Sequence, residues 1–566
     1  MTFRPPSSLA SRLSDRVDAR RLELLPKLAR SPKTDLGQFM TPGPIGRYMA
    51  SMFQAPSMHD VRLLEPGAGL GSLVAAFIEN VCDQFTGVRR VSVTAYEVDG
   101  GLCGPLEQTL DDCVRWAADK GVVVSYELRP IDFIEHAVCL LDNDLFHVRE
   151  TFTHVITNPP YRKVASDSVH RRLLQRIGVE ATNLYSGFVA LAVKLLVPRG
   201  ELVAITPRSF CNGPYFEPFR RLLLFSGGLR HIHTFESRDT AFREDNVLQE
   251  NLIYSFCKSK QQRRVRLSTS AGPDLEECRS RAVAFSEVVR AQDPVSMIHL
   301  PVSAEDDEAA RQIRRLRHSL TDLGIAVSTG PVVDFRLRKF IHQDPLPTTV
   351  PLMYPSHFQK GKMIWPILGG RRPNAIEDTP NTRKWLMPVG YYTVTRRFSS
   401  KEEKRRIVAA VFDPHGVNAG WVGFENHLNV FHRGGLGLEL TVAMGLSAFL
   451  NSTPVDRFFR LFNGHTQVNA SDLRALRYPS LLKLSALGQK LNDRRLSQDR
   501  LDQLVHKTVF DNRAATNESG HKEWRGKSAN RRLTGEAKVV FSGAQLDSRR
   551  CTQEVRAGST TRGSKN

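Results

Sequence analysis

Apolar runs and helical patterns alternate between residues 36 and 260, and this alternation constrains the fold more than any other feature. Seven runs have the length and composition of buried strands, namely VRLLE, VSVTAYEV, VVVSYEL, THVIT, ELVAIT, RHIHTF and NLIYSFCK. Such alternation predicts an α/β fold, in which helices cover both faces of a doubly wound, mostly parallel, seven-stranded sheet. The last two runs have no long helix between them, so we expect them to form an antiparallel pair at the edge of the sheet.

Two segments predict amphipathic helices packed on this sheet. In SLVAAFIENVCDQF, apolar residues at positions 73, 74, 77, 78 and 81 recur at helical spacing. In LGQFMTPGPIGRYMASMF, Thr41 is expected to cap a helix whose first turn contains Pro42. The apolar face of this second helix is formed by Ile45, Met49, Met52 and Phe53.

A chain of 566 residues is too long for one ordinary domain. We expect five regions: a basic lead-in with a short helix (1–35), the catalytic sheet domain (36–260), a polar connector (261–310), an irregular mixed α+β region (311–480), and a helical, then disordered basic tail (481–566). The tail beyond residue 510 is rich in Ser, Thr, Gly, Arg and Lys and has few apolar residues, which favours disorder.

Lys and Arg number 79 against 59 Asp and Glu, which gives a formal net charge of +20. This excess favours a polyanionic partner, most simply nucleic acid, although many basic soluble proteins bind none. The eight cysteines are scattered without a CxxC pair, which fits a reducing cytoplasm and predicts no zinc ribbon. We expect no metal site, no signal peptide and no membrane segment, since Lys194 and Glu439 interrupt the longest apolar runs.

The loop LLEPGAGLGSL follows the first predicted strand and opens a helix. Gly67 and Gly69 allow a tight turn and the close approach of a ligand, but the third glycine comes one place earlier than in a dinucleotide fingerprint. A simple strand-to-helix connection is therefore the alternative. Glu65 ends the first strand, and Glu97 ends the second, where a carboxylate can accept both ribose hydroxyls or be mere surface charge. Acids at both positions suit S-adenosyl-L-methionine, which has an amine, a sulfonium and a ribose but no pyrophosphate.

The tetrapeptide NPPY, residues 158 to 161, stands where the fourth strand should leave the sheet. Ligands gather at the carboxyl ends of the strands in doubly wound sheets. Pro159 and Pro160 fix the backbone and remove two N–H donors, so this loop presents acceptors. Asn158 adds an amide oxygen and Tyr161 a flat ring for stacking. The combination predicts a site that holds a planar group carrying an NH2.

An exocyclic amine on a heteroaromatic ring is a poor nucleophile, because its lone pair is delocalised into the ring. Two acceptors that pull on its two N–H bonds favour a pyramidal nitrogen and aim the lone pair at a sulfonium methyl. Direct displacement then needs little more than alignment and electrostatic support. The amine proton becomes acidic after transfer and can leave to Asn158 or water, so no strong base is required.

Six motifs, LGQFMTP, LEPGAGLGSL, YEVD, IDF, NPPY and FRED, occur in the order found in the γ class, or TaqI-like group, of N6-adenine DNA methyltransferases, which this region resembles. The resemblance implies a class I, Rossmann-like methyltransferase fold. It implies cofactor contacts from Thr41, Glu65, Gly67 and Glu97, with Asp132 facing the adenine of the cofactor and Phe133 beside it. It also implies that Asn158 and Pro159 bind the target amine, that Tyr161 stacks on the base, and that Phe242 is a second aromatic plate. A loop carboxylate at Asp132 and a core ring at Phe242 remain open alternatives.

The C-terminal half resembles modification methylases in TGPVVDFR and in NGHTQVNASDLRALRYP, and the second block is similar to one in XhoI-like enzymes. The amide side chains of this second block suit hydrogen bonding to the edges of bases, and Arg474 suits a contact with guanine or phosphate. We expect a helix to follow, capped by Ser471 or Asp472. An ordinary capped loop explains the block equally well. Lys360 and Lys362 in HFQKGK are candidate phosphate contacts, or parts of a solvated basic surface.

These observations predict a site-specific methyltransferase that acts on N6 of an adenine flipped out of double-stranded DNA. The 311–480 region would read neighbouring base pairs. We expect a monomer that works in the cytoplasm, at the nucleoid when bound to DNA, as the modification enzyme beside a separately acting endonuclease. The alternatives are the same chemistry on cytosine N4, an RNA base or a protein glutamine, or a DNA-binding protein without activity.

Overall fold

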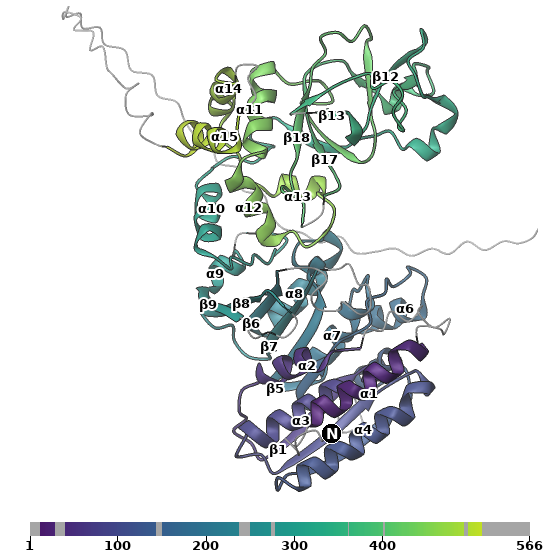
Figure 1. Cartoon of the computed structure of the whole chain (residues 1–566), viewed down its shortest axis with the longest axis vertical. Helices are drawn as coiled ribbons and strands as arrows, with labels where there is room; N and C mark the ends of the chain where they lie inside the picture. Colours follow the sequence, from purple (N-terminus) through teal and green to yellow (C-terminus); the bar gives the residue numbers. More distant parts are fainter. Residues whose placement is uncertain are drawn as a thin grey trace, which may run out of the picture. The chain divides into compact units, whose positions relative to one another are not determined.

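The computed structural model describes residues 12–28, 40–142, 150–236, 250–272, 275, 278–291, 293–359, 361–399, 402–491 and 496–511. Within these residues, nine strands form one sheet in the order β3-β2-β1-β4-β5-β7-β6-β8-β9 (Figure 1). The strands are β1 (Asp60–Pro66), β2 (Arg90–Tyr96), β3 (Val123–Arg129), β4 (Phe152–Thr157), β5 (Leu196–Pro207), β6 (Gly228–Phe235), β7 (Asn251–Cys257), β8 (Arg264–Ser270) and β9 (Cys278–Ala284). Strands β1 to β5 run parallel, and β7 runs antiparallel to both of its neighbours, β5 and β6.

All seven predicted runs are strands, and the α/β fold class is confirmed. The prediction of seven strands was wrong, because β8 and β9 extend the sheet beyond β6. The antiparallel β6–β7 pair therefore lies inside the sheet rather than at its edge. Residues 261–310, expected to be a connector, contain these two strands, α9 (Phe285–Val288) and α10 (Ala304–Arg314). Val283 alone is buried in β9, so this strand carries no apolar pattern that the sequence could reveal.

Helices cover both faces of the sheet. One face carries α1 (Leu13–Leu28), α2 (Gly43–Ser51), α3 (Ser72–Gln84) and α4 (Gly100–Ala118), and Figure 1 shows α1, α3 and α4 beside β1. The other face carries α5 (Phe133–Asp142), α6 (Val169–Arg176), α7 (Leu184–Leu195) and α8 (Glu217–Ser226). Consecutive strand residues enter opposite cores: Leu63 packs under the first group and Leu64 under the second. Burial on both faces explains why these strands are continuous apolar runs instead of alternating ones.

The two helices predicted from apolar spacing are present as α2 and α3. The five apolar positions named for α3 and Ile45, Met49 and Phe53 of the α2 segment all lie in the same core. The predicted cap of α2 was wrong, because Pro42 occupies the N-cap position and the first amide of the helix, that of Gly43, donates to Asp18 over 3.0 Å. Thr41 instead accepts a hydrogen bond from a distant residue, Asn158.

The described C-terminal residues form helices and two mixed sheets of six and five strands, ordered β10-β20-β17-β18-β14-β13 and β11-β15-β12-β19-β16. The strands are β10 (Ala326–Thr329), β11 (Ile341–His342), β12 (Thr349–Met353), β13 (Phe358–Gln359), β14 (Lys362–Met363), β15 (Ala375–Glu377), β16 (Met387–Pro388), β17 (Tyr392–Arg396), β18 (Ala409–Phe412), β19 (Trp421–Phe424) and β20 (Leu428–His432). The helices are α11 (Leu440–Leu450), α12 (Thr453–Phe462), α13 (Ala470–Arg474), α14 (Leu481–Gln489) and α15 (Gln498–Val505). None of the helices formed by the described residues combines the length and apolar character that a bilayer crossing requires.

Candidate active site

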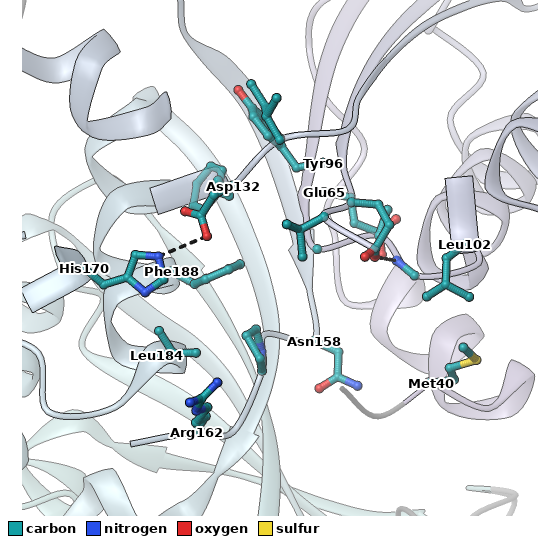
Figure 2. A pocket seen from close by; sticks show the side chains of 18 of the residues that line it. Met40, Glu65, Tyr96, Leu102, Asp132, Asn158, Arg162, His170, Leu184 and Phe188 are labelled. Carbon is teal, nitrogen blue, oxygen red and sulfur yellow. Dashed lines mark hydrogen bonds and ion pairs between the residues drawn. The ribbon is translucent and has the colours of Figure 1, made fainter. Parts of the chain in front are cut away.

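A cavity of about 350 Å³ lies at the carboxyl ends of β1, β2 and β4 (Figure 2). This volume falls in the range of pockets that bind small molecules. The predicted site residues that line it are Thr41, Glu65, Gly67, Gly69, Glu97, Asp132, Phe133, Asn158 and Pro160. Residues more than 100 positions apart in the sequence are thus brought together, because the ends of neighbouring parallel strands meet at one edge of the sheet.

The glycine loop turns from β1 into α3 with backbone angles that favour glycine. Gly67, Gly69 and Gly71 have φ values of +102°, +56° and +76°. The turn is fixed because the amide of Gly67 donates to the carbonyl of Tyr96 over 3.0 Å. The early third glycine has a packing reason, since a Cβ on Gly71 would lie 2.9 Å from Leu106 Cδ1. Apart from its two chain neighbours, the described residues place no atom within 4 Å of the corresponding point on Gly69, so a ligand can approach the backbone there.

Two buried carboxylates stand on either side of the glycine loop. Glu65 accepts a hydrogen bond from the amide of Val74 over 3.2 Å. Burial raises the pKa of Glu65 well above its usual value; the Val74 N–H opposes this and the charge of Glu97 adds to it. Glu97 accepts from the amide of Gly69 over 2.8 Å and from that of Asp99 over 2.7 Å. The glycine loop and the second carboxylate therefore hold each other in place.

Asp132 lies between β3 and α5, and its two oxygens have different partners. Oδ1 accepts from the amide of Glu135 over 3.0 Å, so the carboxylate is anchored to the first turn of α5. Oδ2 lies 3.1 Å from Nε2 of His170, the contact drawn in Figure 2. Burial raises the pKa of Asp132, but the hydrogen bonds from His170 and Glu135 outweigh it and bring this pKa below its usual value.

Aromatic rings form the apolar side of the cavity. The ring of Phe133 lies 5.2 Å from that of Phe188, on α7, and 5.1 Å from that of Tyr96. Phe188 also lies 3.6 Å from the point where a Cβ on Gly67 would stand. Aromatic rings and acidic side chains thus line the same small space, as a ligand with a flat ring and polar substituents requires.

The corner after β4 is held by side-chain hydrogen bonds. The amide nitrogen of Asn158 donates to the Thr41 hydroxyl over 3.1 Å. The hydroxyl of Tyr161 donates to Asn158 Oδ1 over 2.9 Å, and the carbonyl oxygen of Ile205, 3.3 Å away, is a second acceptor for the same hydrogen. Burial raises the pKa of Tyr161 well above its usual value, so the phenol stays protonated and able to donate. Pro159 and Tyr161 do not appear among the lining residues, although they flank the two that do.

Several lining residues were not predicted, among them Met40, Arg162, Lys163, His170 and Phe188. Met40, Arg162 and Lys163 adjoin predicted site residues in the sequence, and this proximity could have identified them. Phe188 lies in a uniformly apolar helix, and His170 in a short charged one. No sequence signal separates these two from ordinary helix residues.

The residues expected to contact DNA are described only in part. Phe242 and Lys360 are outside the described residues. Lys362 and Arg474 are exposed, and neither lines the cavity.

The block NGHTQVNASDL is buried or partly buried apart from Thr466. Asn463 and Asp472 are 1% and 0% exposed. Asp472 accepts from the amide groups of Asn212 over 3.2 Å and of Asn463 over 3.1 Å. The predicted caps were wrong, because Asn469 caps α13, with Asp472 at the third helical position. The amides of Asn463 and Asn469 therefore serve internal hydrogen bonds, and the alternative of an ordinary capped loop describes the block better.

Comparison with known proteins identifies the family of the chain. Residues 126–242 match the family model described as Eco57I restriction-modification methylase. Type II methyltransferase M.PstI of Providencia stuartii is 41% identical over 497 residues, which cover 87% of this chain and 96% of that protein. Type II methyltransferase M.BsuBI of Bacillus subtilis is 42% identical over 509 residues, which cover 89% and 99%. The solved DrdV–DNA complex is more distant, with a TM-score of 0.45 and 13% identity over 84% of this chain and 59% of that chain. The chain belongs to the Type II methyltransferases of restriction-modification systems.

Proposed function

We propose that this methyltransferase transfers a methyl group to N6 of adenine within a specific duplex DNA sequence. The observation that carries the proposal is the position of Asn158. This residue follows β4 and lines the cofactor cavity, and its amide nitrogen donates to Thr41. Its oxygen accepts from Tyr161 over 2.9 Å and has a second lone pair with which it can accept from a substrate amine.

The cofactor is S-adenosyl-L-methionine, which supplies an electrophilic methyl group when it is bound. The donors of this molecule match the acceptors of the cavity. Glu65 suits the cationic methionyl part, Glu97 the two ribose hydroxyls, and Asp132 the adenine amine, with the ring of Phe133 beside it. Thr41, Gly67 and Gly69 also line the cavity and are assigned to the cofactor for this reason.

The chain activates the target amine through geometry. Oδ1 of Asn158 and the carbonyl oxygen of Pro159 accept the two amino hydrogens, and Pro160 keeps this corner rigid because its backbone torsion is fixed. The nitrogen lone pair is thereby withdrawn from the ring and directed into the cavity. Tyr161 provides the flat face on which the base stacks, with Phe242 as the second plate. The proton of the amine passes to water.

The target adenine has to flip out of the DNA duplex to reach the corner after β4, because a base that is stacked in the duplex cannot enter this corner. We assign the reading of the flanking sequence to residues 311–480, with Lys362 and Arg474 on phosphates or guanine. The protein would act as a monomer on chromosomal DNA in the cytoplasm and protect it from a separate endonuclease. The excess of 20 positive charges supports a polyanionic partner.

The test is the identity of the methylated product. The protein is incubated with S-adenosyl-L-methionine carrying a labelled methyl group and with duplex DNA of mixed sequence, and the digested nucleosides are separated by mass spectrometry. Label in N6-methyladenine is expected. Label in N4-methylcytosine would contradict the assignment to adenine. Label in neither, with DNA still bound, would contradict the assignment of methyl transfer to this corner.

A further inference from the structure

His170 stands opposite Asp132 on the wall of the cofactor cavity, although it comes from a different element. Its ring nitrogen Nε2 lies 3.1 Å from Asp132 Oδ2. His170 belongs to the first turn of α6, which begins after Ser168 caps the helix by accepting from the amide of Arg171 over 3.2 Å. The pair therefore joins the segment that follows the catalytic corner to the loop that precedes α5.

The pair is exposed enough to contribute little to the stability of the fold. The two side chains are 32% and 27% exposed, and ion pairs at such positions are typically weak. A partly exposed carboxylate on a cavity wall would otherwise rotate or take water. With Oδ1 held by the amide of Glu135 and Oδ2 by His170, the plane of the Asp132 carboxylate is set from both sides.

The charges around His170 favour its role as a donor. Its pKa is raised, first because of the hydrogen bond to Asp132, with burial opposing and the charge of Glu135 adding. Arg162, which also lines the cavity, acts in the opposite direction. Either the charged ring or the neutral tautomer protonated at Nε2 can donate to Asp132. A carboxylate oxygen accepts more than one hydrogen bond, so Oδ2 can take a second donor from a ligand.

We propose that His170 is a positioning residue for the cofactor, which orients the Asp132 carboxylate so that it accepts the amino group of the cofactor adenine. The inference rests on the placement of Asp132 against that adenine in the proposed function. The role of His170 also links the cofactor site to the site of the target base. Residues 162–170 run from the corner after β4, which is assigned to the target amine, to the contact between His170 and Asp132. Val164 donates through its amide to Thr182 over 3.0 Å, so the same segment is also tied to the residues before α7.

The test measures binding of S-adenosylhomocysteine by calorimetry, apart from any methyl transfer. Asp132→Ala is expected to weaken binding about 10-fold or more. His170→Ala is expected to weaken it about 5-fold, because the Asp132 carboxylate loses the one hydrogen bond that orients its Oδ2. His170→Gln keeps a neutral donor of similar reach and is expected to bind within about twofold of the wild type. His59→Ala, an exposed histidine at the amino end of β1, is the matched control.

A second ligand separates positioning from a general structural effect. The deaminated analogue, S-inosylhomocysteine, carries an oxygen in place of the adenine amine. If His170 acts through Asp132 on that amine, His170→Ala weakens the adenine ligand and leaves the affinity for the analogue unchanged. The double variant with Asp132→Ala is then no weaker than Asp132→Ala alone. Hydrogen exchange of residues 162–170 is expected to slow on ligand binding in the wild type and less so in His170→Ala.

The possible failures are distinguishable. If Asp132→Ala binds S-adenosylhomocysteine as tightly as the wild type, the placement of Asp132 in the proposed site is wrong. If Asp132→Ala weakens binding and His170→Ala does not, the inference about His170 alone is overturned. Equal weakening of both ligands by His170→Ala overturns it as well, since the effect then does not pass through the amine.

Discussion

The amide nitrogen of Asn158 donates a hydrogen bond to the hydroxyl of Thr41 over 3.1 Å, which joins the start of α2 to the corner after β4. The contact decides which way the amide faces. With its nitrogen engaged by Thr41, its oxygen is the end directed toward Tyr161. Thr41, which the sequence assigned to the cofactor, thus also sets the orientation of Asn158, which it assigned to the target amine.

Replacing Thr41 by Val should therefore slow the chemical step. Val keeps the shape but removes the acceptor, so the amide of Asn158 loses its fixed orientation. We expect kcat to fall about 5- to 10-fold, the equivalent of about 1–1.5 kcal/mol for one hydrogen bond. Thr41→Ser keeps the hydroxyl and should stay within about twofold of the wild type. Equal kcat values for Thr41→Val and Thr41→Ser would contradict this role.

Glu65 should make the stability of the ligand-free protein depend on pH. Its pKa is raised well above the usual value, chiefly by burial. The folded protein therefore keeps a proton that the unfolded chain loses above about pH 4.3. Unfolding then releases a proton, and stability falls as the pH rises, by at most about 1.4 kcal/mol per pH unit until the folded pKa is passed.

Urea denaturation between pH 5 and 8 measures this effect. Glu65→Gln keeps an acceptor for the Val74 amide but has no proton to lose, so its stability should decline less with pH than that of the wild type. Glu107→Gln, an exposed position on α4, serves as control and should follow the wild type. Parallel curves for wild type and Glu65→Gln would show that Glu65 is ionised in the folded protein throughout this range.

Asp472 should be important for stability rather than for base recognition. It is fully buried and accepts from Asn212 and Asn463, so Asp472→Ala removes a buried acceptor from both amides. We expect a loss of about 2–4 kcal/mol in the free energy of unfolding. Arg474→Ala, on the same helix but exposed, should cost less than about 0.5 kcal/mol. A comparable small cost for Asp472→Ala would contradict the internal role of this block.

Lys362 and Arg474 should contribute to the salt dependence of DNA binding. If each neutralises one phosphate, its replacement by Ala lowers the slope of log K against log salt by about 1 and weakens binding to all sequences alike. Lys120→Ala, exposed at the end of α4, provides the control. An unchanged slope would exclude a phosphate contact, and a sequence-dependent loss for Arg474→Ala would point to a guanine contact.

The sequence predicted the part of the fold that rests on local pattern. Seven strands stand out as apolar runs, six of which are mostly buried, and α3 stands out by its spacing. Strands β8 and β9 escaped prediction because neither forms a continuous apolar run. In β8 the apolar residues Val265 and Leu267 alternate with polar ones, and β9, at the edge of the sheet, buries only Val283. The site residues beside strand ends were predicted because topology, not side-chain detail, brings them together.

Contacts between distant residues could not be predicted in this way. Thr41 has the composition of a helix cap, and nothing local indicates that its partner is Asn158. Asn212 and Asp472 meet although 260 residues separate them, and amides of the kind that read bases proved to be buried. The pairing of His170 with Asp132 likewise depends on the packing of α6 against α5.

The most direct test of the account is the single-turnover rate of methyl transfer to duplex DNA by Asn158→Ala, measured with the binding of S-adenosylhomocysteine. Asn158→Asp keeps an acceptor oxygen and should recover part of any loss. Because Asn158 is assigned to the target amine and not to the cofactor, Asn158→Ala should lose about 100- to 1,000-fold in rate while its affinity for the ligand changes less than about threefold. Formation of N6-methyladenine by Asn158→Ala at the wild-type rate would contradict the account.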